Sequence, residues 1–232
     1  MIEFRKVSVV YPNGTRALTD INCRIEKGEF VFLVGPTGQG KSTLLKLVYH
    51  EIVPAVGDVL VGNQNIRRLS ARQVAFLRRR VGVVFQDFRL LNNRTLWENI
   101  AYALRVTGAS HKRINKIVPE LLCRVGLSHK AESFPNQVSA GEQQRAAIAR
   151  ALANSPVILL ADEPTGNLDP DTGLGIMNLL QEINLSGTTV VCATHNQIFV
   201  DALRKRVISI LDGCIVSDEL EGTYPPTARV GQ

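Results

Sequence analysis

The sequence lacks a long apolar run, a leader segment and any repeat. No stretch approaches the ~20 consecutive apolar residues that a helix needs to cross a bilayer. The first residues, MIEFRKVSVVY, place charges inside an apolar pattern and are not followed by a small-residue cleavage site, which argues against a signal peptide. Neither coiled-coil heptads nor an internal repeat is present. We therefore expect a chain without a membrane span that remains in the cytoplasm.

Paired cysteines are also missing. The four cysteines are Cys23, Cys123, Cys192 and Cys214. They are widely spaced and form no Cys-x-x-Cys motif, so neither a zinc site nor a disulfide framework is indicated. Reduced thiols are the default expectation for such a chain.

Size and composition are those of an ordinary globular protein. The 232 residues are 45% hydrophobic and 21% charged, enough for one large α/β domain or a core with a small subdomain. The net charge is +6, and much of the excess is concentrated in one segment. That segment contains Arg67, Arg68, Arg72, Arg78, Arg79 and Arg80.

This arginine cluster has two interpretations. It can be a solvated helix face, the usual meaning of a charge run, or a surface that lies near anionic lipid headgroups. Aromatic residues are not interleaved with the arginines as a base-stacking surface requires, so no nucleic-acid partner is expected.

The hydrophobic pattern predicts a hairpin followed by a parallel α/β core. Residues 2–11 and 18–25 alternate around a Pro-Asn-Gly turn, which predicts an antiparallel hairpin. Residues 30–34 are entirely apolar, typical of a strand covered on both faces. Glycines and then a helical pattern over residues 42–50 follow directly. Strand, glycine loop and helix in this order predict one unit of a parallel α/β sheet.

Later segments complete the predicted domain plan. A capping box at Ser70 begins a short helix. Further buried strands and a helix near residues 174–183 continue the core. We expect a β-subdomain and core over residues 1–88 and 152–222, a helical subdomain over about 89–151, and a flexible tail over 223–232.

The glycine loop carries a phosphate-binding motif. Its residues are Gly35, Pro36, Thr37, Gly38, Gln39, Gly40, Lys41 and Ser42, a match to G-x-x-x-x-G-K-[ST]. Glycines allow backbone N–H groups to turn inward, and the helix N-terminus adds partial positive charge. Lys41 is predicted to bridge phosphate oxygens, and Ser42 to bind Mg²⁺.

Two carboxylates follow a second buried strand. Asp162 and Glu163 end the apolar run at residues 157–161. Asp162, at the strand tip, is predicted to hold Mg²⁺, and Glu163 to activate the attacking water as general base. Together with the phosphate loop, this pair predicts ATP hydrolysis.

The segment 138–145, Val-Ser-Ala-Gly-Glu-Gln-Gln-Arg, resembles the signature sequence of the ABC (ATP-binding cassette) ATPases. The resemblance covers residues 1 to about 220. It implies the ABC fold: a RecA-like P-loop NTPase core with an N-terminal antiparallel β-subdomain and a helical insertion. It also implies a homodimer in which Ser139 and Gly141 contact ATP bound to the partner. Ala140 departs from the usual glycine, so we predict a helical φ there, since alanine is strained at positive φ.

The same resemblance assigns further residues by position. It implies that Tyr11 stacks on adenine, Gln86 contacts metal and membrane partner, Asp169 crosses the dimer interface, and His195 lies near the γ-phosphate as a catalytic residue. Thr43 follows Ser42 and is included among the nucleotide-binding residues.

Within the family, residues 76–91 and 160–169 resemble the bacterial cell-division ATPases. This implies an integral membrane partner subunit and no small-molecule cargo bound by this chain. The ATPases of lipoprotein release and macrolide export share the second stretch, so a transporter subunit is the alternative. Phe88, Leu90 and Leu91 form either a groove for the partner or simple core. A soluble ABC protein acting on DNA or ribosomes, or a small-molecule kinase, fits less well, because segment 138–145 has no role in a kinase.

Overall fold

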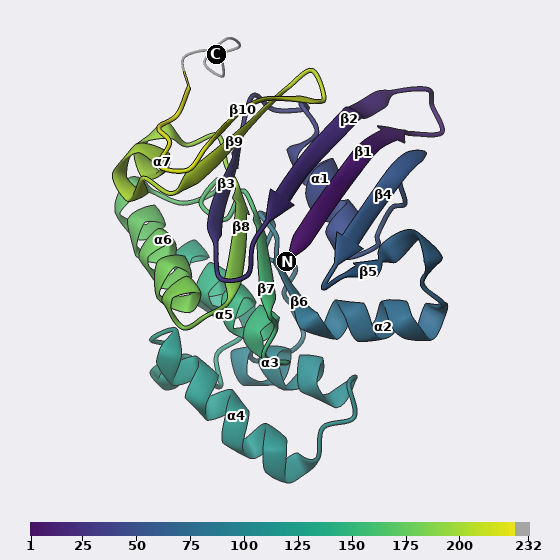
Figure 1. Ribbon diagram of the computed structural model, residues 1–232. Helices are drawn as coiled ribbons and strands as arrows, with labels where there is room; N and C mark the ends of the chain where they lie inside the picture. Colours follow the sequence, from purple (N-terminus) through teal and green to yellow (C-terminus); the bar gives the residue numbers. More distant parts are fainter. Residues whose placement is uncertain (226–232) are drawn as a thin grey trace.

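The computed structural model describes residues 1–225, whose strands form two sheets (Figure 1). The smaller sheet is antiparallel, in the order β2-β1-β4-β5. Its strands are β1 (Ile2–Val10), β2 (Arg16–Ile25), β4 (Val56–Val61) and β5 (Gln64–Asn65). The predicted N-terminal hairpin is thus confirmed by the β1–β2 pair.

The larger sheet has the order β10-β9-β3-β8-β7-β6 and is parallel except at β10. Its strands are β3 (Phe30–Val34), β6 (Val81–Val84), β7 (Ile158–Asp162), β8 (Thr189–Ala193), β9 (Arg206–Leu211) and β10 (Cys214–Glu219). Because the parallel strands end at the same edge, the residues after β3 and β7 come close together there.

β3 divides its side chains between two hydrophobic cores, which is why its sequence is apolar throughout. Phe30 and Phe32 face the core shared with the helices on one side of the sheet. Val31 and Leu33 face the core between the two sheets, where α1 (Lys41–Val48) packs. The helix that starts the phosphate site is thus held between two layers.

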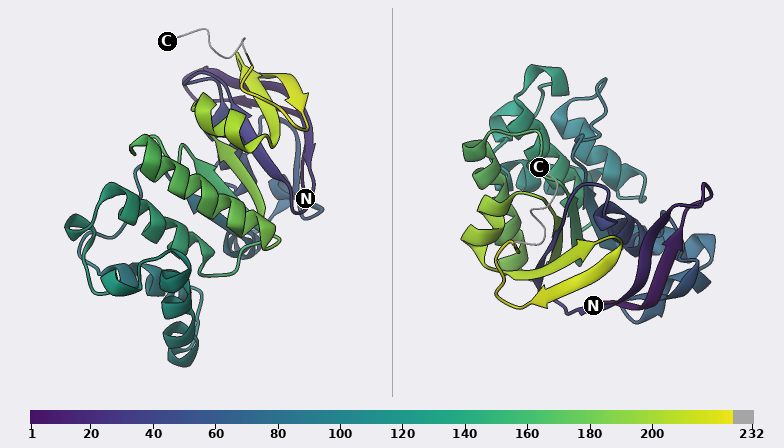
Figure 2. Two further views of the ribbon diagram at one scale, coloured as in Figure 1. Left: turned by 90° about the vertical axis from the view of Figure 1, so that its left-hand side faces the viewer. Right: turned by 90° about the horizontal axis from the view of Figure 1, so that it is seen from above.

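Helix α2 (Ala71–Arg80) packs on the same side as α1, where its Leu77 is buried in the core between the sheets. The remaining helices cover the other face and one end of the large sheet. They are α3 (Leu96–Arg105), α4 (His111–Arg124), α5 (Ala140–Leu152), α6 (Pro170–Leu185) and α7 (Gln197–Leu203). Figures 1 and 2 show α3 and α4 gathered at the end of the molecule away from β9 and β10. Short 3₁₀ turns at Ile66–Arg68, Ser128–Lys130 and Pro135–Gln137 link them. Within residues 1–225, no helix has the length and apolar character needed to span a bilayer.

Several expectations need correction. Strands β4 and β5 and helix α7 were not predicted, and α6 begins at Pro170 rather than near residue 174. The prediction of a flexible tail from residue 223 is wrong at Tyr224, because this residue is 6% exposed and packs in the hydrophobic core. Its backbone N–H donates to Asp201 Oδ1 at 2.7 Å. Residues 226–232 lie outside the described part of the chain, and the division into 1–88 with 152–222 and 89–151 stays a prediction.

Candidate functional site

The phosphate loop connects β3 to α1 and needs glycine at its end. Gly40 precedes α1 with φ +101°, a left-handed backbone conformation that residues other than glycine rarely adopt. A Cβ on Gly40 would lie 2.5 Å from the carbonyl oxygen of Ala17. The loop borders a pocket of about 310 Å³. The residues that line it are Thr37, Gly38, Gly40, Lys41, Ser42, Thr43, Gln86, Asp162, Glu163 and His195.

Lys41 provides the positive charge of this pocket. Its side chain is 5% exposed, and its ammonium donates to the carbonyl oxygens of Gly35 at 2.7 Å and Pro36 at 3.0 Å. Glu163 Oε1 lies 3.7 Å from Lys41 Nζ. Burial lowers the pKa of Lys41, while Glu163 and Asp162 oppose that shift. A buried ammonium beside inward-facing backbone groups can bind a polyphosphate.

Asp162 ends β7 next to the start of α1. Ser42 Oγ donates to Asp162 Oδ1 at 2.9 Å, which joins two of the three predicted Mg²⁺ ligands. Burial raises the pKa of Asp162, and the Ser42 hydrogen bond opposes this. Among the described residues, no three His, Cys, Asp or Glu side chains form a group that holds a metal alone. The hydroxyl, amide and carboxylate oxygens of Ser42, Gln86 and Asp162 are nevertheless the hard ligands that suit Mg²⁺ together with phosphates.

Glu163 lies between Lys41 and His195. Its Oε2 is 3.0 Å from His195 Nδ1, and the backbone N–H of His195 donates to the same oxygen at 3.3 Å. Its backbone has φ +48°, and its N–H donates to the Ala193 carbonyl at 2.9 Å, linking it to β8. A positive φ at a residue other than glycine is unfavourable, and at Glu163 it is accompanied by this hydrogen bond to β8. This carboxylate, with a side chain 14% exposed, faces the pocket from which water would attack a terminal phosphate.

Sequence reasoning missed the residues that hold these loops. Gln144 in α5 is fully buried and donates to the Pro164 carbonyl at 2.7 Å, directly after Glu163. Arg150, also in α5, donates to the carbonyls of Phe88 and Arg89 in the loop after Gln86. Their partners are backbone atoms of distant segments, so no sequence pattern identifies them; the position of Gln144 within segment 138–145 was the only signal.

The other predicted nucleotide residues lie outside the pocket lining. Tyr11 Oη is 3.1 Å from Thr43 Oγ1, which places the tyrosine beside the start of α1. Gln39 accepts a hydrogen bond from the backbone N–H of Asp212. Gly35 and Pro36 supply the carbonyls bound by Lys41.

Ser139, Gly141 and Asp169 lie at helix starts and do not line the pocket of their own chain. Ser139 caps α5 in a capping box with Glu142, and Asp169 caps α6 by accepting from the Thr172 N–H at 3.0 Å. Ala140 is the first residue of α5 and is not among the positive-φ residues, so the predicted helical φ is confirmed.

A shallow groove of about 360 Å³ lies between α2, β6 and α3. We call it the α2–α3 groove; its apolar lining includes Phe85, Leu91, Tyr102 and Val106, with Arg78, Arg79 and Arg150 also lining it. The predicted groove residues are therefore only partly right. Leu91 lines it, whereas Phe88 and Leu90 do not, and Leu90 packs against the hydrophobic core.

A phosphate loop after the buried parallel strand β3, with a carboxylate pair at the end of β7 on the far side of β8, defines a P-loop nucleotide hydrolase. The ABC transporter family matches residues 18–166, and the chain belongs to that family. It is therefore an ABC-type ATPase with the RecA-like core, antiparallel β-subdomain and helical insertion that the sequence predicted.

Several known proteins are similar in sequence or structure to nearly the whole chain. The cell division ATP-binding protein FtsE of Bacillus subtilis is 51% identical over 97% of this chain and 98% of its own length. FtsE of Escherichia coli is 45% identical over 92% of this chain and 96% of its own. The ATP-binding cassette MJ0796, solved as a dimer bound to ADP and Pi, has 36% identity and a TM-score of 0.86, covering 97% of this chain and 100% of that chain.

Proposed function

We propose that this ATPase binds and hydrolyses MgATP as a homodimer and drives an integral membrane subunit of the FtsX type in bacterial cell division. The observation that carries the ATPase part is Glu163 held between Lys41 and His195 beside the phosphate loop. The division role is supported by FtsE relatives in several bacteria at 45 to 51% identity. Coupling to cell-wall hydrolases outside the cytoplasm follows from that role.

The proposed chemistry distributes roles over the pocket. Backbone N–H groups of the loop and Lys41 bind the β- and γ-phosphates. Glu163 accepts a proton from the attacking water, and His195 holds water and phosphate in line. Ser42, Asp162 and Gln86 would hold Mg²⁺, which neutralises phosphate charge when bound. Tyr11, beside Thr43, would stack on the adenine.

The proposed dimer completes each site with a second copy. Ser139, Gly141 and Asp169 lie away from the pocket of their own chain, at the N-termini of α5 and α6. Free N–H groups and partial positive charge at the start of α5 suit a terminal phosphate bound by the partner. The dimeric MJ0796 cassette supports this arrangement.

The membrane subunit would dock in the α2–α3 groove. The groove combines apolar side chains with arginines and lies next to the loop that contains Gln86. Arg150 joins α5 to that loop, so a shift of α5 during dimer closure would reach the groove. In this role the chain would lie on the cytoplasmic face of the plasma membrane, at the division site.

The decisive experiment substitutes the proposed general base. Glu163→Gln keeps size and hydrogen bonding but cannot accept the proton, so hydrolysis should fall about 10²–10⁴-fold. ATP should then hold the variant as a dimer in size-exclusion chromatography with light scattering. Glu182→Gln, the same change at an exposed position of α6, serves as the control and should behave as wild type. A Glu163→Gln variant that hydrolyses ATP normally, or stays monomeric with ATP, would refute the mechanism.

The alternative role is the ATPase subunit of a lipoprotein-release or macrolide-export transporter. The two roles differ in the membrane subunit, so co-purification of the complex from membranes separates them. An FtsX-like subunit supports the division role, and a transporter permease refutes it while leaving the ATPase assignment intact.

A further inference from the structure

The arginines of the cluster seen in the sequence are all exposed in the structure. We call it the arginine surface; its members are Arg67, Arg68, Arg72, Arg78, Arg79 and Arg80, all exposed on the turn before α2 and on α2 itself. No acidic residue occurs between Asp58 and Asp87. Across residues 1–225, none of these arginines forms an ion pair with a carboxylate. Their charge is therefore available to an external anion.

An aromatic ring lies in the middle of this surface. α2 buries Leu77, and the opposite face of the helix presents Arg72, Phe76 and Arg79, which share one side at helical spacing. Phe76 is 55% exposed, and the Arg79 guanidinium lies 5.2 Å from its ring centroid. The expectation that no aromatic residue accompanies the arginines is wrong at this one position. Phe76 therefore gives the cationic face of α2 one exposed apolar group that can insert at a membrane interface.

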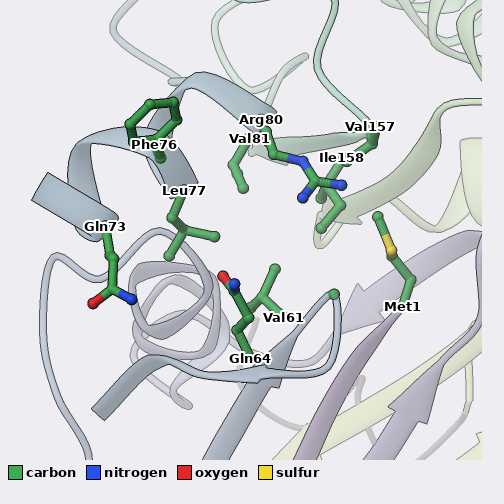
Figure 3. A pocket seen from close by; sticks show the side chains of 11 residues that line it. Met1, Val61, Gln64, Gln73, Phe76, Leu77, Arg80, Val81, Val157 and Ile158 are labelled. Atoms are coloured by element: carbon green, nitrogen blue, oxygen red, sulfur yellow. The ribbon is translucent and has the colours of Figure 1, made fainter. Parts of the chain in front are cut away.

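A groove and a pocket border the two sides of α2. On one side Arg78 donates to the carbonyls of Tyr49 and His50 and borders the α2–α3 groove. On the other side Arg80 borders a pocket of about 270 Å³ with a mainly apolar lining, shown in Figure 3. Leu77 and Phe76 both line this pocket, and Figure 3 shows Leu77 directed into it. The arginine surface thus lies between the α2–α3 groove and this second, mainly apolar pocket.

We propose that the arginine surface binds anionic phospholipid headgroups, with the Phe76 ring inserted at the interface. Each arginine near an anionic leaflet contributes favourable energy, and a buried aromatic ring adds an apolar term. The surface is continuous with the α2–α3 groove through Arg78 and Arg79. It adds a direct lipid contact to the proposed membrane attachment, which otherwise depends on the partner subunit alone.

Vesicle co-sedimentation of the full chain tests this contact without the membrane subunit. Wild type should bind vesicles of phosphatidylglycerol mixed with phosphatidylcholine and not vesicles of phosphatidylcholine alone. Binding should weaken strongly in 0.5 M salt, because exposed charges are screened beyond about 4 Å there. The triple variant Arg68→Gln/Arg72→Gln/Arg80→Gln should lower the partition coefficient about fivefold per arginine, or about 100-fold in total.

Two further variants make the result specific. Lys112→Gln/Arg113→Gln/Lys116→Gln removes the same charge from exposed positions of α4 and should keep most of the binding. Phe76→Ser should weaken binding to the anionic vesicles, and the binding that remains should be abolished by 0.5 M salt. The proposal would be overturned if the α4 control lost as much binding as the triple variant, or if wild type did not bind anionic vesicles. Equal binding to neutral vesicles, or preferential binding of a duplex RNA, would also overturn it. ATPase activity is measured in parallel, so a failure of the proposed enzyme function is recognised separately.

Discussion

The first turns of α5 and α6 meet at Gly141, so a substitution of this glycine tests how closely the two helices pack. Gly141 is buried, and a Cβ added there would lie 2.3 Å from Thr172 Cγ2. Thr172 is held by its backbone N–H, which donates to Asp169 Oδ1 at 3.0 Å. Gly141→Ala therefore forces the threonine side chain to rotate or the two helices to separate.

The expected cost follows from two opposing terms. Overpacking by one methyl group costs about 1–3 kcal/mol. Replacing glycine by alanine inside a helix returns up to about 1 kcal/mol, less in the first turn. The net loss of unfolding free energy should be about 1–2 kcal/mol, or about 2–8 °C in Tm for a chain of this size.

The assay is urea and thermal unfolding, with Thr172→Ser as the matched background. That substitution removes only the Cγ2 atom and should change stability little alone, within about 0.5 kcal/mol. In its presence Gly141→Ala should become neutral or stabilising, so a double-mutant cycle should show a coupling of about 1–2 kcal/mol. Equal destabilisation in both backgrounds, or none in the wild-type background, would refute the packing argument.

Three further outcomes are expected at neighbouring positions. Ala140→Gly should lower stability by less than about 1 kcal/mol, because φ at this helix start is already negative, and ATPase assays should show retained turnover. Gln144→Ala should cost about 1–3 kcal/mol in urea unfolding, since it leaves the buried Pro164 carbonyl without its donor. Without nucleotide, burial raises the pKa of Asp162 in the folded protein above its ordinary value of 3.8. The protonated carboxyl therefore contributes to the free energy of unfolding below pH 3.8, and this contribution is lost as the pH rises through the higher pKa of the folded state. Asp162→Asn should accordingly unfold at higher urea than wild type at pH 7, with the difference disappearing in acid, while hydrolysis is lost.

The sequence predicts the phosphate site well because its parts are contiguous. Residues 35–42 and the pair Asp162 and Glu163 each follow an uninterrupted apolar strand, so motif and context are read together. Parallel pairing then brings the ends of β3, β8 and β7 to one edge. The capping box at Ser70 was equally local, and the structure confirms it.

Other features depend on contacts that no local pattern contains. β4 holds Gly57 at φ +84°, which weakens its strand signal, and its pairing with β1 and β5 makes it a strand. Tyr224 is one aromatic residue among prolines, and its burial depends on Asp201 and the core beneath it. The positive φ of Glu163 likewise results from its link to β8 and not from its neighbours in sequence.

The contacts of Lys41 explain why the two carboxylates can take different roles. Its ammonium is shared between the Gly35 and Pro36 carbonyls and, at 3.7 Å, Glu163. A terminal phosphate is a stronger partner than a carbonyl, so a triphosphate in the pocket would compete for the ammonium and leave Glu163 to His195. Asp162 would keep its hydrogen bond from Ser42 and remain next to the phosphates, whereas Glu163, released from Lys41, would face the pocket beside His195. In the proposed mechanism, substrate binding would thus prepare Glu163 to act as the general base, because the buried Lys41 links that carboxylate to the phosphate loop.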